Sequence, residues 1–441
     1  MNVLVVGGNP AGMSAASRIK RKQPDAQVVV LEKTREVSYG ACGLPYYVAG
    51  LNDNLDLIRI RRVAEFEENG VTVKLGREAV RASFAEKKVW AKLPDGTEEC
   101  YPYDKLLIAS GSSPKAPPIP GIGQKNIFQL KTLQDAEQIK QAITETRGNV
   151  IIVGGGYIGL EIAEACVLQK AKSVRLIEAL PRVLNVFDPE FSDAVRGELE
   201  KHGVSVHTGE MVKCFSGSDG RVTGVVTDQG AYDADLVVLA IGVSPNTRWL
   251  EGIDKLPNGA IITDGGMKTS VEDVFAAGDC ATVIHGLLKK PVYFALGTNA
   301  NKQGRLAGDS MLGKPVKLER ALGTSMLRCM DLELAKTGLG EEDAKREGLE
   351  CIYKTVKCRS HARYYPDPHE LTVKLTVRKA DHVLLGAQIM GEKEAVWRIN
   401  VFACAIDQGM KTEELGYLDM GYAPPFAGVW DAVQIAANAV K

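Results

Sequence analysis

A single cysteine stands in a sterically open setting near the start of the chain. The segment SYGACGLPYY, residues 38–47, places Cys42 between Ala41 and Gly43. Pro45 favours the first turn of a helix, so Cys42 is expected just before a helix N-terminus, where the dipole and unbonded amides stabilise a thiolate. Such a thiolate can form a mixed disulfide with a small thiol, or cycle through a sulfenic acid with oxygen or peroxide. The alternative is a buried structural cysteine.

Two Gly-rich turns indicate two dinucleotide sites. Residues 3–32 and 150–178 each read as an apolar strand, a Gly-rich turn, a helix, a second strand and a terminal glutamate. The glycines let the backbone approach a pyrophosphate, and the helix N-terminus supplies its dipole. The terminal carboxylate can accept hydrogen bonds from ribose hydroxyls and would repel a 2′-phosphate, which favours NADH over NADPH. Two Gly-rich turns in unrelated α/β units are the alternative interpretation.

The two turns differ in completeness. The second has the full G-x-G-x-x-G pattern and a terminal acid, at Gly154, Gly156, Gly159 and Glu178. The first has three of these four positions, at Gly7, Gly12 and Glu32. Asn9 takes its middle position, and we expect the turn to survive because asparagine tolerates positive φ better than other non-glycine residues.

Two dinucleotides in one chain suggest a relay in which a nicotinamide delivers hydride and a flavin receives it. The segment VEDVFAAGDCA, residues 271–281, reads as a strand that runs into Gly278 and Asp279. The Asp279 carboxylate could hold a flavin ribityl hydroxyl. The segment LLIASGSSP, residues 106–114, is a second strand that ends in small residues, among them Ser110, a further expected flavin contact.

Bulk composition narrows the class of protein. The chain has 441 residues, too many for one core, and 45% hydrophobic with 25% charged residues is ordinary for a globular protein. A net charge of -1 argues against whole-surface binding to nucleic acid or anionic lipid. No targeting segment and no membrane span are expected. Nine irregularly spaced cysteines indicate a reducing cytoplasm rather than a disulfide framework.

The order of motifs resembles the pyridine nucleotide–disulfide oxidoreductases. The first Gly turn, SYGACGLP, the second Gly turn, AAGD and a C-terminal strand-and-helix segment follow one another along essentially the whole chain. Residues 370–391 alternate as strands around a turn, and residues 394–409 read as an amphipathic helix. The positions five before and five after Cys42 hold no cysteine, so the resemblance is to the single-cysteine branch, closest to coenzyme A-disulfide reductase.

The resemblance implies an α/β fold with two Rossmann-like dinucleotide-binding domains, as in glutathione reductase, and a C-terminal α+β dimerisation domain. The Pro-rich segment KAPPIPG, which follows residue 114, marks a boundary. The expected domains are an FAD-binding domain at 1–112 and 246–320, an NAD(H)-binding domain at 113–245 and a dimerisation domain at 321–441. FAD, NADH or NADPH, and coenzyme A as substrate or bound thiol are the implied ligands.

A homodimer with a shared active site is also implied. Tyr364 and Tyr422 should reach Cys42 of the partner subunit, where a phenol can protonate a departing thiolate. Tyr365 is the less favoured alternative to Tyr364, because packing at the dimer interface is the better interpretation of a tyrosine at position 365. For all three tyrosines, packing at the dimer interface is the alternative interpretation.

The second turn carries two further residues with implied roles. In the family, the tyrosine at the position of Tyr157 stacks over the flavin until nicotinamide displaces it, and the glutamate at the position of Glu161 lies close to the nicotinamide. A carboxylate that complements the helix dipole is a compatible interpretation of Glu161.

Coenzyme A requires a local anion site. One face of a helix can present Arg18, Arg21 and Lys22, and the segment IRIRR supplies Arg59, Arg61 and Arg62. Either cluster alone would be interpreted as a solvated basic face. Two clusters that flank Cys42 favour phosphate binding. In the family, the thiol substrate channel is lined by positions that correspond here to Ser14, Arg18, Arg21, Ser38 and Asn299.

Competing activities remain open at this point. Oxidase and peroxidase relatives usually carry a histidine in the first Gly turn, and here that position is Pro10, which cannot move protons. The chain ends about where the dimerisation domain is expected to end. This weakly favours a disulfide as the substrate over a persulfide. The alternatives are an NADH oxidase or peroxidase that uses a cysteine sulfenic acid, and a flavin electron carrier to a protein partner. A zinc site at Cys358, His361 and His369 is rejected, because a fourth ligand is not evident.

Overall fold

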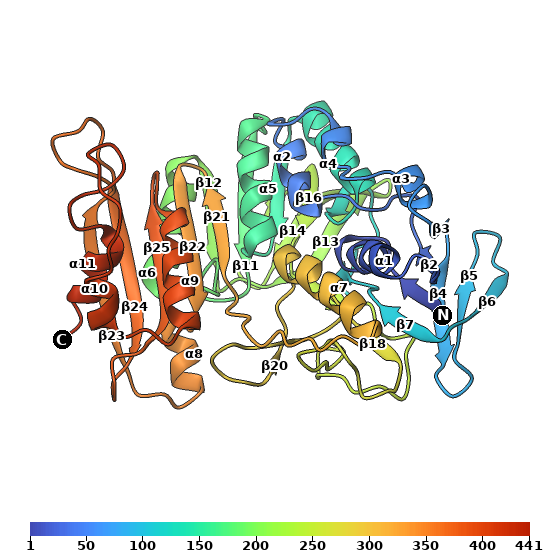
Figure 1. Ribbon diagram of the computed structural model, residues 1–441. Coiled ribbons are helices and arrows are strands. Elements are labelled where there is room, and N and C mark those ends of the chain that lie inside the picture. The colour runs from blue at the N-terminus through green and yellow to red at the C-terminus, as the bar shows by residue number, and fades with distance from the viewer. The chain divides into compact units, whose positions relative to one another are not determined.

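The computed structural model describes residues 1–441, which form two compact units (Figure 1). Unit 1 consists of Met1–Leu44, Asp53–Lys115 and Val243–Ala321, and unit 2 of Pro45–Asn52, Ala116–Gly242 and Leu322–Lys441. The division into three domains stays a prediction. No helix in the chain is both long enough and apolar enough to pass through a membrane.

Unit 1 is built on a parallel five-stranded sheet in the order β18-β7-β1-β2-β3. Its strands are rich in valine and leucine, as buried parallel strands require, and span Val274–Ala276, Lys105–Ile108, Asn2–Val6, Gln27–Glu32 and Val71–Leu75. Helices α1 (Pro10–Lys22) and α7 (Gly297–Met311) pack closely against each other. A Cβ atom on Gly304 would lie 2.1 Å from the carbonyl oxygen of Ala11, so only glycine permits this approach.

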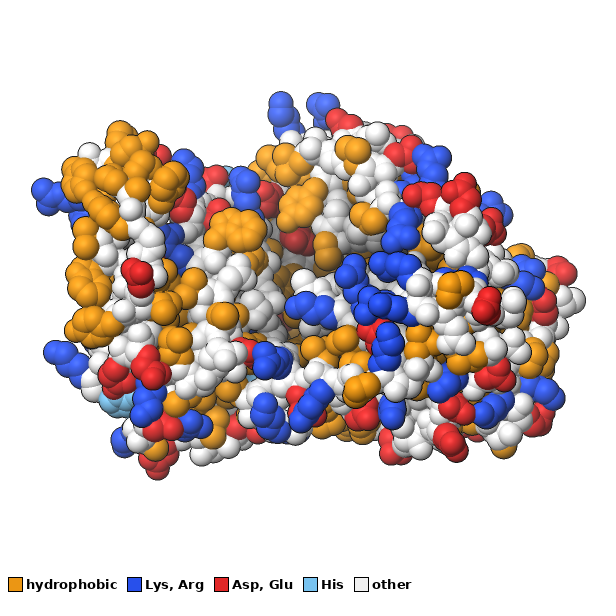
Figure 2. All heavy atoms as spheres, in the orientation of Figure 1, with side chains coloured by type: hydrophobic (Ala, Val, Ile, Leu, Met, Phe, Trp, Pro, Cys, Tyr) orange, Lys and Arg blue, Asp and Glu red, His pale blue; other side chains and the backbone are white.

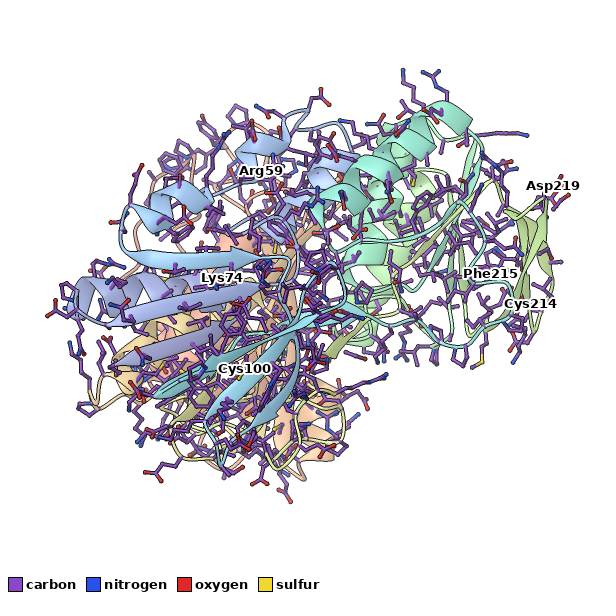
Figure 3. All side chains as sticks on the ribbon, turned by 90° about the vertical axis from the view of Figure 1, so that its right-hand side faces the viewer. Arg59, Lys74, Cys100, Cys214, Phe215 and Asp219 are labelled. Carbon is purple, nitrogen blue, oxygen red and sulfur yellow. The ribbon has the colours of Figure 1, made fainter.

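Smaller elements complete unit 1. An antiparallel sheet contains β4 (Glu78–Ser83), β5 (Lys88–Lys92) and β6 (Glu98–Pro102), and two strand pairs join β8 (Ser112–Pro114) to β17 (Val243–Pro245) and β19 (Val283–Ile284) to β20 (Pro291–Val292). Figure 3 labels Lys74 on β3 and Cys100 on β6; the Lys74 ammonium lies over the ring of Tyr101, 5.0 Å from its centre. Short helical segments lie at Ala41–Gly43, Leu55–Leu57 and Val63–Glu67 (α3).

Unit 2 repeats the parallel arrangement in a second sheet, ordered β12-β11-β10-β16-β9. The strands span Val204–Thr208, Ser173–Glu178, Asn149–Val153, Leu236–Leu239 and Ile127–Gln129. The helices of this part are α2 (Leu44–Val48, whose first residue lies in unit 1), α4 (Leu133–Thr146), α5 (Tyr157–Leu168) and α6 (Pro189–Lys201). An antiparallel sheet joins β13 (Val212–Ser218), β14 (Arg221–Thr227) and β15 (Ala231–Asp233), and Phe215 on β13 is buried (Figure 3).

The C-terminal part of unit 2 is an antiparallel sheet with helices on it. Its order is β21-β22-β25-β24-β23, and the strands span Ser325–Cys329, Leu332–Gly338, Leu384–Gly391, Glu370–Arg378 and Cys351–Arg359. The helices are α8 (Glu341–Arg346), α9 (Ile399–Asp407, after a 3-10 turn at Val396–Arg398), α10 (Thr412–Gly416) and α11 (Ala432–Asn438). The strands expected in 370–391 and the helix expected in 394–409 are confirmed. The expected α/β fold class is therefore present.

Candidate active site

The thiol of Cys42 lies at the N-terminus of a long helix. Cys42 is exposed in the 3-10 turn that leads directly into α2, as expected from Pro45. A Cβ atom on Gly297, the first residue of α7, would lie 3.9 Å from the Cys42 sulfur. Helix α7 begins without a side-chain cap and without an acidic residue in its first turn. A helix N-terminus of this kind can stabilise an anion beside it. The sequence predicted only α2, because no local pattern indicates the contact with α7.

The first Gly-rich turn has the geometry of a dinucleotide site. Gly7 has φ of +114°, and a Cβ atom on Gly12 would lie 1.9 Å from the Gly7 carbonyl oxygen. Buried Glu32 accepts a hydrogen bond from the Gly8 amide at 2.7 Å. Asn9 has φ of -106°, so the expectation of a positive φ at this position was wrong. The middle position is the extended N-cap of α1, which most residues can adopt.

The second turn repeats this geometry in unit 2. Gly154 has φ of +108°, and a Cβ atom on Gly159 would lie 1.9 Å from the Gly154 carbonyl oxygen. Glu178 accepts a hydrogen bond from the Gly155 amide at 2.6 Å, as Glu32 does from Gly8. The carboxylate thus also fixes the turn, a role that sequence reasoning did not assign.

Both turns fit a dinucleotide. Helices α1 and α5 begin without a side-chain cap and without an acidic residue in the first turn, so their N-terminal amides can bind a pyrophosphate. A Cβ atom on Gly156 would meet no atom within 4 Å, which leaves space in front of the second turn. In unit 1 the Asp279 carboxylate accepts a hydrogen bond from the Ser112 hydroxyl at 2.9 Å. The Ser110 hydroxyl donates to the carbonyl of Asn246 at 2.7 Å and so joins two segments of unit 1.

Tyr157 and Glu161 lie on the first two turns of α5, where burial changes their acidity. Burial raises the pKa of Glu161 from 4.5 to about 7, and the Glu164 carboxylate adds to this effect. Burial also raises the pKa of Tyr157, whose hydroxyl is 2.7 Å from that of Ser325. Because Glu161 lies beyond the first turn, its interaction with the helix dipole is weakened. A carboxyl group poised near neutral pH can gain or lose a proton during turnover.

The structure distinguishes the two tyrosines at 364 and 365. The Tyr364 hydroxyl forms a hydrogen bond with the Tyr422 hydroxyl. This bond raises the pKa of Tyr422. The Tyr365 ring instead packs edge-on against His361, with ring centres 5.5 Å apart. Tyr364 and Tyr422 line a pocket of about 410 Å³ in unit 2.

The basic residues of unit 1 fall into two groups. Figure 2 shows Lys and Arg side chains gathered over α1, which ends in Lys20, Arg21 and Lys22. Arg18 makes a bidentate ion pair with Asp309 on α7, at 3.0 and 2.7 Å. Arg18 therefore has a partner within the fold that sequence reasoning missed.

The second basic group lines a pocket of about 340 Å³. Its basic residues are Arg35, Arg59, Arg61 and Arg62. The Arg59 guanidinium (Figure 3) pairs with Glu36 at 2.7 Å and Asp56 at 2.8 Å. Arg61 lies over the Phe66 ring, 4.8 Å from its centre.

The remaining predicted substrate residues belong to unit 1. Ser38 has a left-handed φ of 51°, and its amide donates to the Gly8 carbonyl at 2.9 Å. The Ser14 hydroxyl accepts from the Asn301 amide group at 3.0 Å. Asn299 lies in the first turn of α7, the helix that begins beside Cys42. The first Gly-rich turn, Ser38 and the Cys42 helix terminus are therefore parts of one compact unit.

Two dinucleotide turns and an exposed thiol at a helix N-terminus are the features expected of an NAD(P)H-dependent oxidoreductase. Residues 1–304 match the family model described as pyridine nucleotide-disulphide oxidoreductase, and residues 326–433 match the dimerisation domain of that family. The chain belongs to the pyridine nucleotide–disulfide oxidoreductase family. It is an NAD(P)H oxidoreductase of a flavoprotein family, which confirms the resemblance drawn from its motifs.

Three similar proteins illustrate the range of activities. An NAD(P)H sulfur oxidoreductase (CoA-dependent) from Pyrococcus abyssi is 38% identical, covering 100% of this chain and 98% of that one. The solved NAD-dependent persulfide reductase from A. fulgidus is 35% identical with a TM-score of 0.96, covering 99% of this chain and 82% of that one. The water-forming NADH oxidase from Lactobacillus brevis, bound to NADH, is 31% identical with a TM-score of 0.96. The match covers 100% of this chain and 98% of that one.

Proposed function

We propose that this chain is an FAD-dependent NAD(P)H reductase that cleaves coenzyme A disulfide, or a related low-molecular-weight disulfide or persulfide, through Cys42. The observation that carries this proposal is the exposed Cys42 thiol at the N-terminus of α7, in the same compact unit as the first Gly-rich turn. The Pyrococcus abyssi relative is an NAD(P)H sulfur oxidoreductase described as CoA-dependent, and this supports the choice of substrate class.

Cys42 is proposed to react as a nucleophile. Its thiolate attacks one sulfur of the incoming disulfide, forms a mixed disulfide and releases the other half as a thiolate. The bound nicotinamide and flavin supply the electron pair that later cleaves the mixed disulfide. Cys42 then returns to the thiolate, and the second half leaves as a thiol. For a persulfide substrate the products are a thiol and sulfide.

A phenol is proposed to protonate the departing thiolate. The candidates are the partner subunit's Tyr364 and the partner's Tyr422, whose hydroxyls share a hydrogen bond. Exposed aromatic side chains in the C-terminal part support a homodimer, because large apolar groups at a surface mark interaction sites (Figure 2). This aromatic surface consists of Tyr364, Tyr365, Trp397, Tyr417, Tyr422, Phe426 and Trp430.

Coenzyme A carries phosphates, and the basic groups of unit 1 are proposed to bind them. The arginine-lined pocket is the stronger candidate, because Arg61 and Arg62 are exposed there, and Arg62 contacts Asp56 at 3.5 Å. Arg21 and Lys22 are exposed at the end of α1, whereas the Arg18 guanidinium forms an ion pair with Asp309. A reducing cytoplasm suits nine cysteines without a disulfide, and this location stays a prediction.

An NADH oxidase is the second candidate, favoured by the 31% identity to the water-forming oxidase from Lactobacillus brevis. Such an enzyme would use Cys42 as a sulfenic acid. Pro10, the first residue of α1, argues against it, because no proton-carrying side chain stands at the position where oxidase relatives usually have histidine.

Replacing Cys42 tests the proposal. Cys42→Ser should abolish NADH-dependent reduction of coenzyme A disulfide and leave transfer from NADH to a dye largely intact. Cys100→Ser, at another exposed cysteine, is the matched control and should retain both activities. Full disulfide reduction by Cys42→Ser would favour the electron-carrier alternative. A wild-type enzyme that consumes oxygen but no disulfide would favour the oxidase.

A further inference from the structure

Two irregular segments carry the hydrogen-bonded tyrosines. Tyr364 lies in residues 360–369, between β23 and β24, and Tyr422 lies in residues 417–431, between α10 and α11. Both side chains are exposed, at 74% and 44%. Exposed side chains on irregular segments have little packing to hold them, yet the two hydroxyls form a hydrogen bond. Buried contacts beneath the tyrosines must therefore set their separation.

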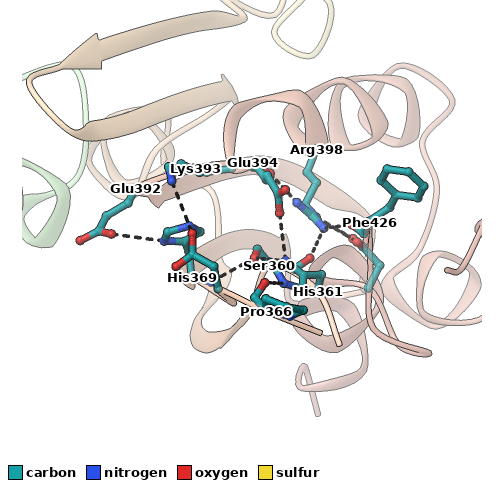
Figure 4. A network of polar contacts seen from close by, with 12 residues as sticks. Ser360, His361, Pro366, His369, Glu392, Lys393, Glu394, Arg398 and Phe426 are labelled. Carbon is teal, nitrogen blue, oxygen red and sulfur yellow. Dashed lines mark hydrogen bonds and ion pairs between the residues drawn. The ribbon is translucent and has the colours of Figure 1, made fainter. Parts of the chain in front are cut away.

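A single arginine connects the two segments. Arg398 immediately precedes α9, and its side chain is 11% exposed. Its guanidinium donates hydrogen bonds to the backbone carbonyl of Ser360 at 2.6 Å and to that of Phe426 at 3.3 Å (Figure 4). The first carbonyl begins the Tyr364 segment, and the second belongs to the Tyr422 segment.

The charge of Arg398 is balanced by a buried carboxylate. Its Nε atom pairs with Asp431 at 2.9 Å, and Asp431 is 5% exposed. Asp431 also caps α11 by accepting a hydrogen bond from the Val433 amide at 3.0 Å. The ion pair therefore joins α9 to the start of α11. A planar guanidinium with several fixed donors suits this role, whereas a lysine ammonium cannot present the same fork.

The turn around Tyr364 has a second support. Buried His361 contacts the Pro366 carbonyl through Nε2 at 3.0 Å and the Ser360 hydroxyl through Nδ1 at 2.9 Å (Figure 4). The edge-on packing of Tyr365 against the His361 ring directs Tyr365 away from the Tyr364–Tyr422 pair. The histidine thus shapes the loop, and Arg398 connects that loop to the second segment.

We propose that Arg398 is a positioning residue that holds Tyr364 and Tyr422 as a hydrogen-bonded acid pair for the departing thiolate. This inference rests on the proposed reduction of disulfides. Tyr422 donates its O–H to the Tyr364 oxygen, and Tyr364 gives its own proton to the thiolate as the sulfur–sulfur bond breaks. The resulting Tyr364 phenolate is stabilised by the bond from Tyr422, and solvent then returns the proton.

Two disulfides that differ in their leaving thiol provide the test. Coenzyme A thiolate is basic and benefits from an acid, whereas a nitrobenzoate thiolate leaves easily without a proton. Arg398→Lys should lower kcat about tenfold with coenzyme A disulfide, with KM unchanged, because general acids contribute about 10²–10⁴-fold. It should leave kcat with the aromatic disulfide unchanged. Arg378→Lys, which disturbs a bidentate pair with Asp381, is the matched control and should change neither rate.

A double-mutant cycle completes the test. Tyr422→Phe should lower kcat with coenzyme A disulfide, and Arg398→Lys added to it should cause no further loss, because the pair is already broken. Equal losses with both disulfides, losses that multiply in the double variant, or wild-type turnover by Arg398→Lys would overturn the proposal. The proposal would also be overturned if Tyr364→Phe and Tyr422→Phe, each as a single variant, turned over coenzyme A disulfide at the wild-type rate. Cys42→Ser reports separately on the proposed function.

Discussion

Replacing Glu161 by glutamine should stabilise the folded protein above neutral pH and leave it unchanged in acid. Burial and the neighbouring Glu164 carboxylate raise the pKa of Glu161 from 4.5 to about 7. A shift of this size corresponds to about 3 kcal/mol of penalty on the charged form. The folded protein keeps this proton at pH values where the unfolded chain has released it. The free energy of unfolding therefore falls as the pH rises from about 4.5 to about 7.

Glutamine removes that pH dependence because it stays neutral. Glu161→Gln should raise the free energy of unfolding by about 2–3 kcal/mol at pH ~8 and by less than about 0.5 kcal/mol at pH ~4.5. Chemical unfolding of the holoenzyme at both pH values measures this difference. Glu137→Gln, at an exposed position on α4, is the control and should show no pH-dependent gain. The same change at both pH values, or a loss of stability at the higher one, would refute the reasoning.

Gly156→Ala should raise KM for NADH about tenfold while the protein folds normally, because its Cβ atom meets no protein atom and would enter the space proposed for the pyrophosphate. Gly159→Ala should instead lower stability by about 1–3 kcal/mol, because its Cβ atom would clash with the Gly154 carbonyl oxygen. Equal effects of the two changes on folding would contradict this reasoning. Lys374→Met should cost about 3–5 kcal/mol of stability at neutral pH, because it leaves Asp188, now 2.9 Å from the ammonium, buried and unpaired. A loss below about 1 kcal/mol in chemical unfolding would count against that account.

Local patterns predicted the two nucleotide turns, because a strand, a Gly-rich turn and a helix follow one another within each repeat. The terminal acids Glu32 and Glu178 were found for the same reason, although their bonds to the turn amides were not foreseen. The backbone conformation of Asn9 was predicted wrongly. The middle position of the motif requires space for a ligand, and it does not require a positive φ. A sequence motif records which side chains are small, and it does not say which dihedral angle each one adopts.

Contacts between distant segments were beyond the sequence. The ion pair of Arg18 with Asp309 joins residues 291 positions apart, and the predicted role of Arg18 in substrate binding stays a prediction beside it. The start of α7 beside Cys42 depends likewise on how α7 packs on α1. The resemblance favoured Tyr364 over Tyr365, but the packing of the Tyr365 ring against His361 was not foreseen.

The most direct test of the central claim is the mass of the Cys42 peptide after the reduced enzyme reacts with one equivalent of coenzyme A disulfide. We expect a coenzyme A adduct on Cys42, released as coenzyme A when NADH is added. A Cys42 peptide that carries only oxygen, or no adduct at all while the disulfide is consumed, would contradict the account.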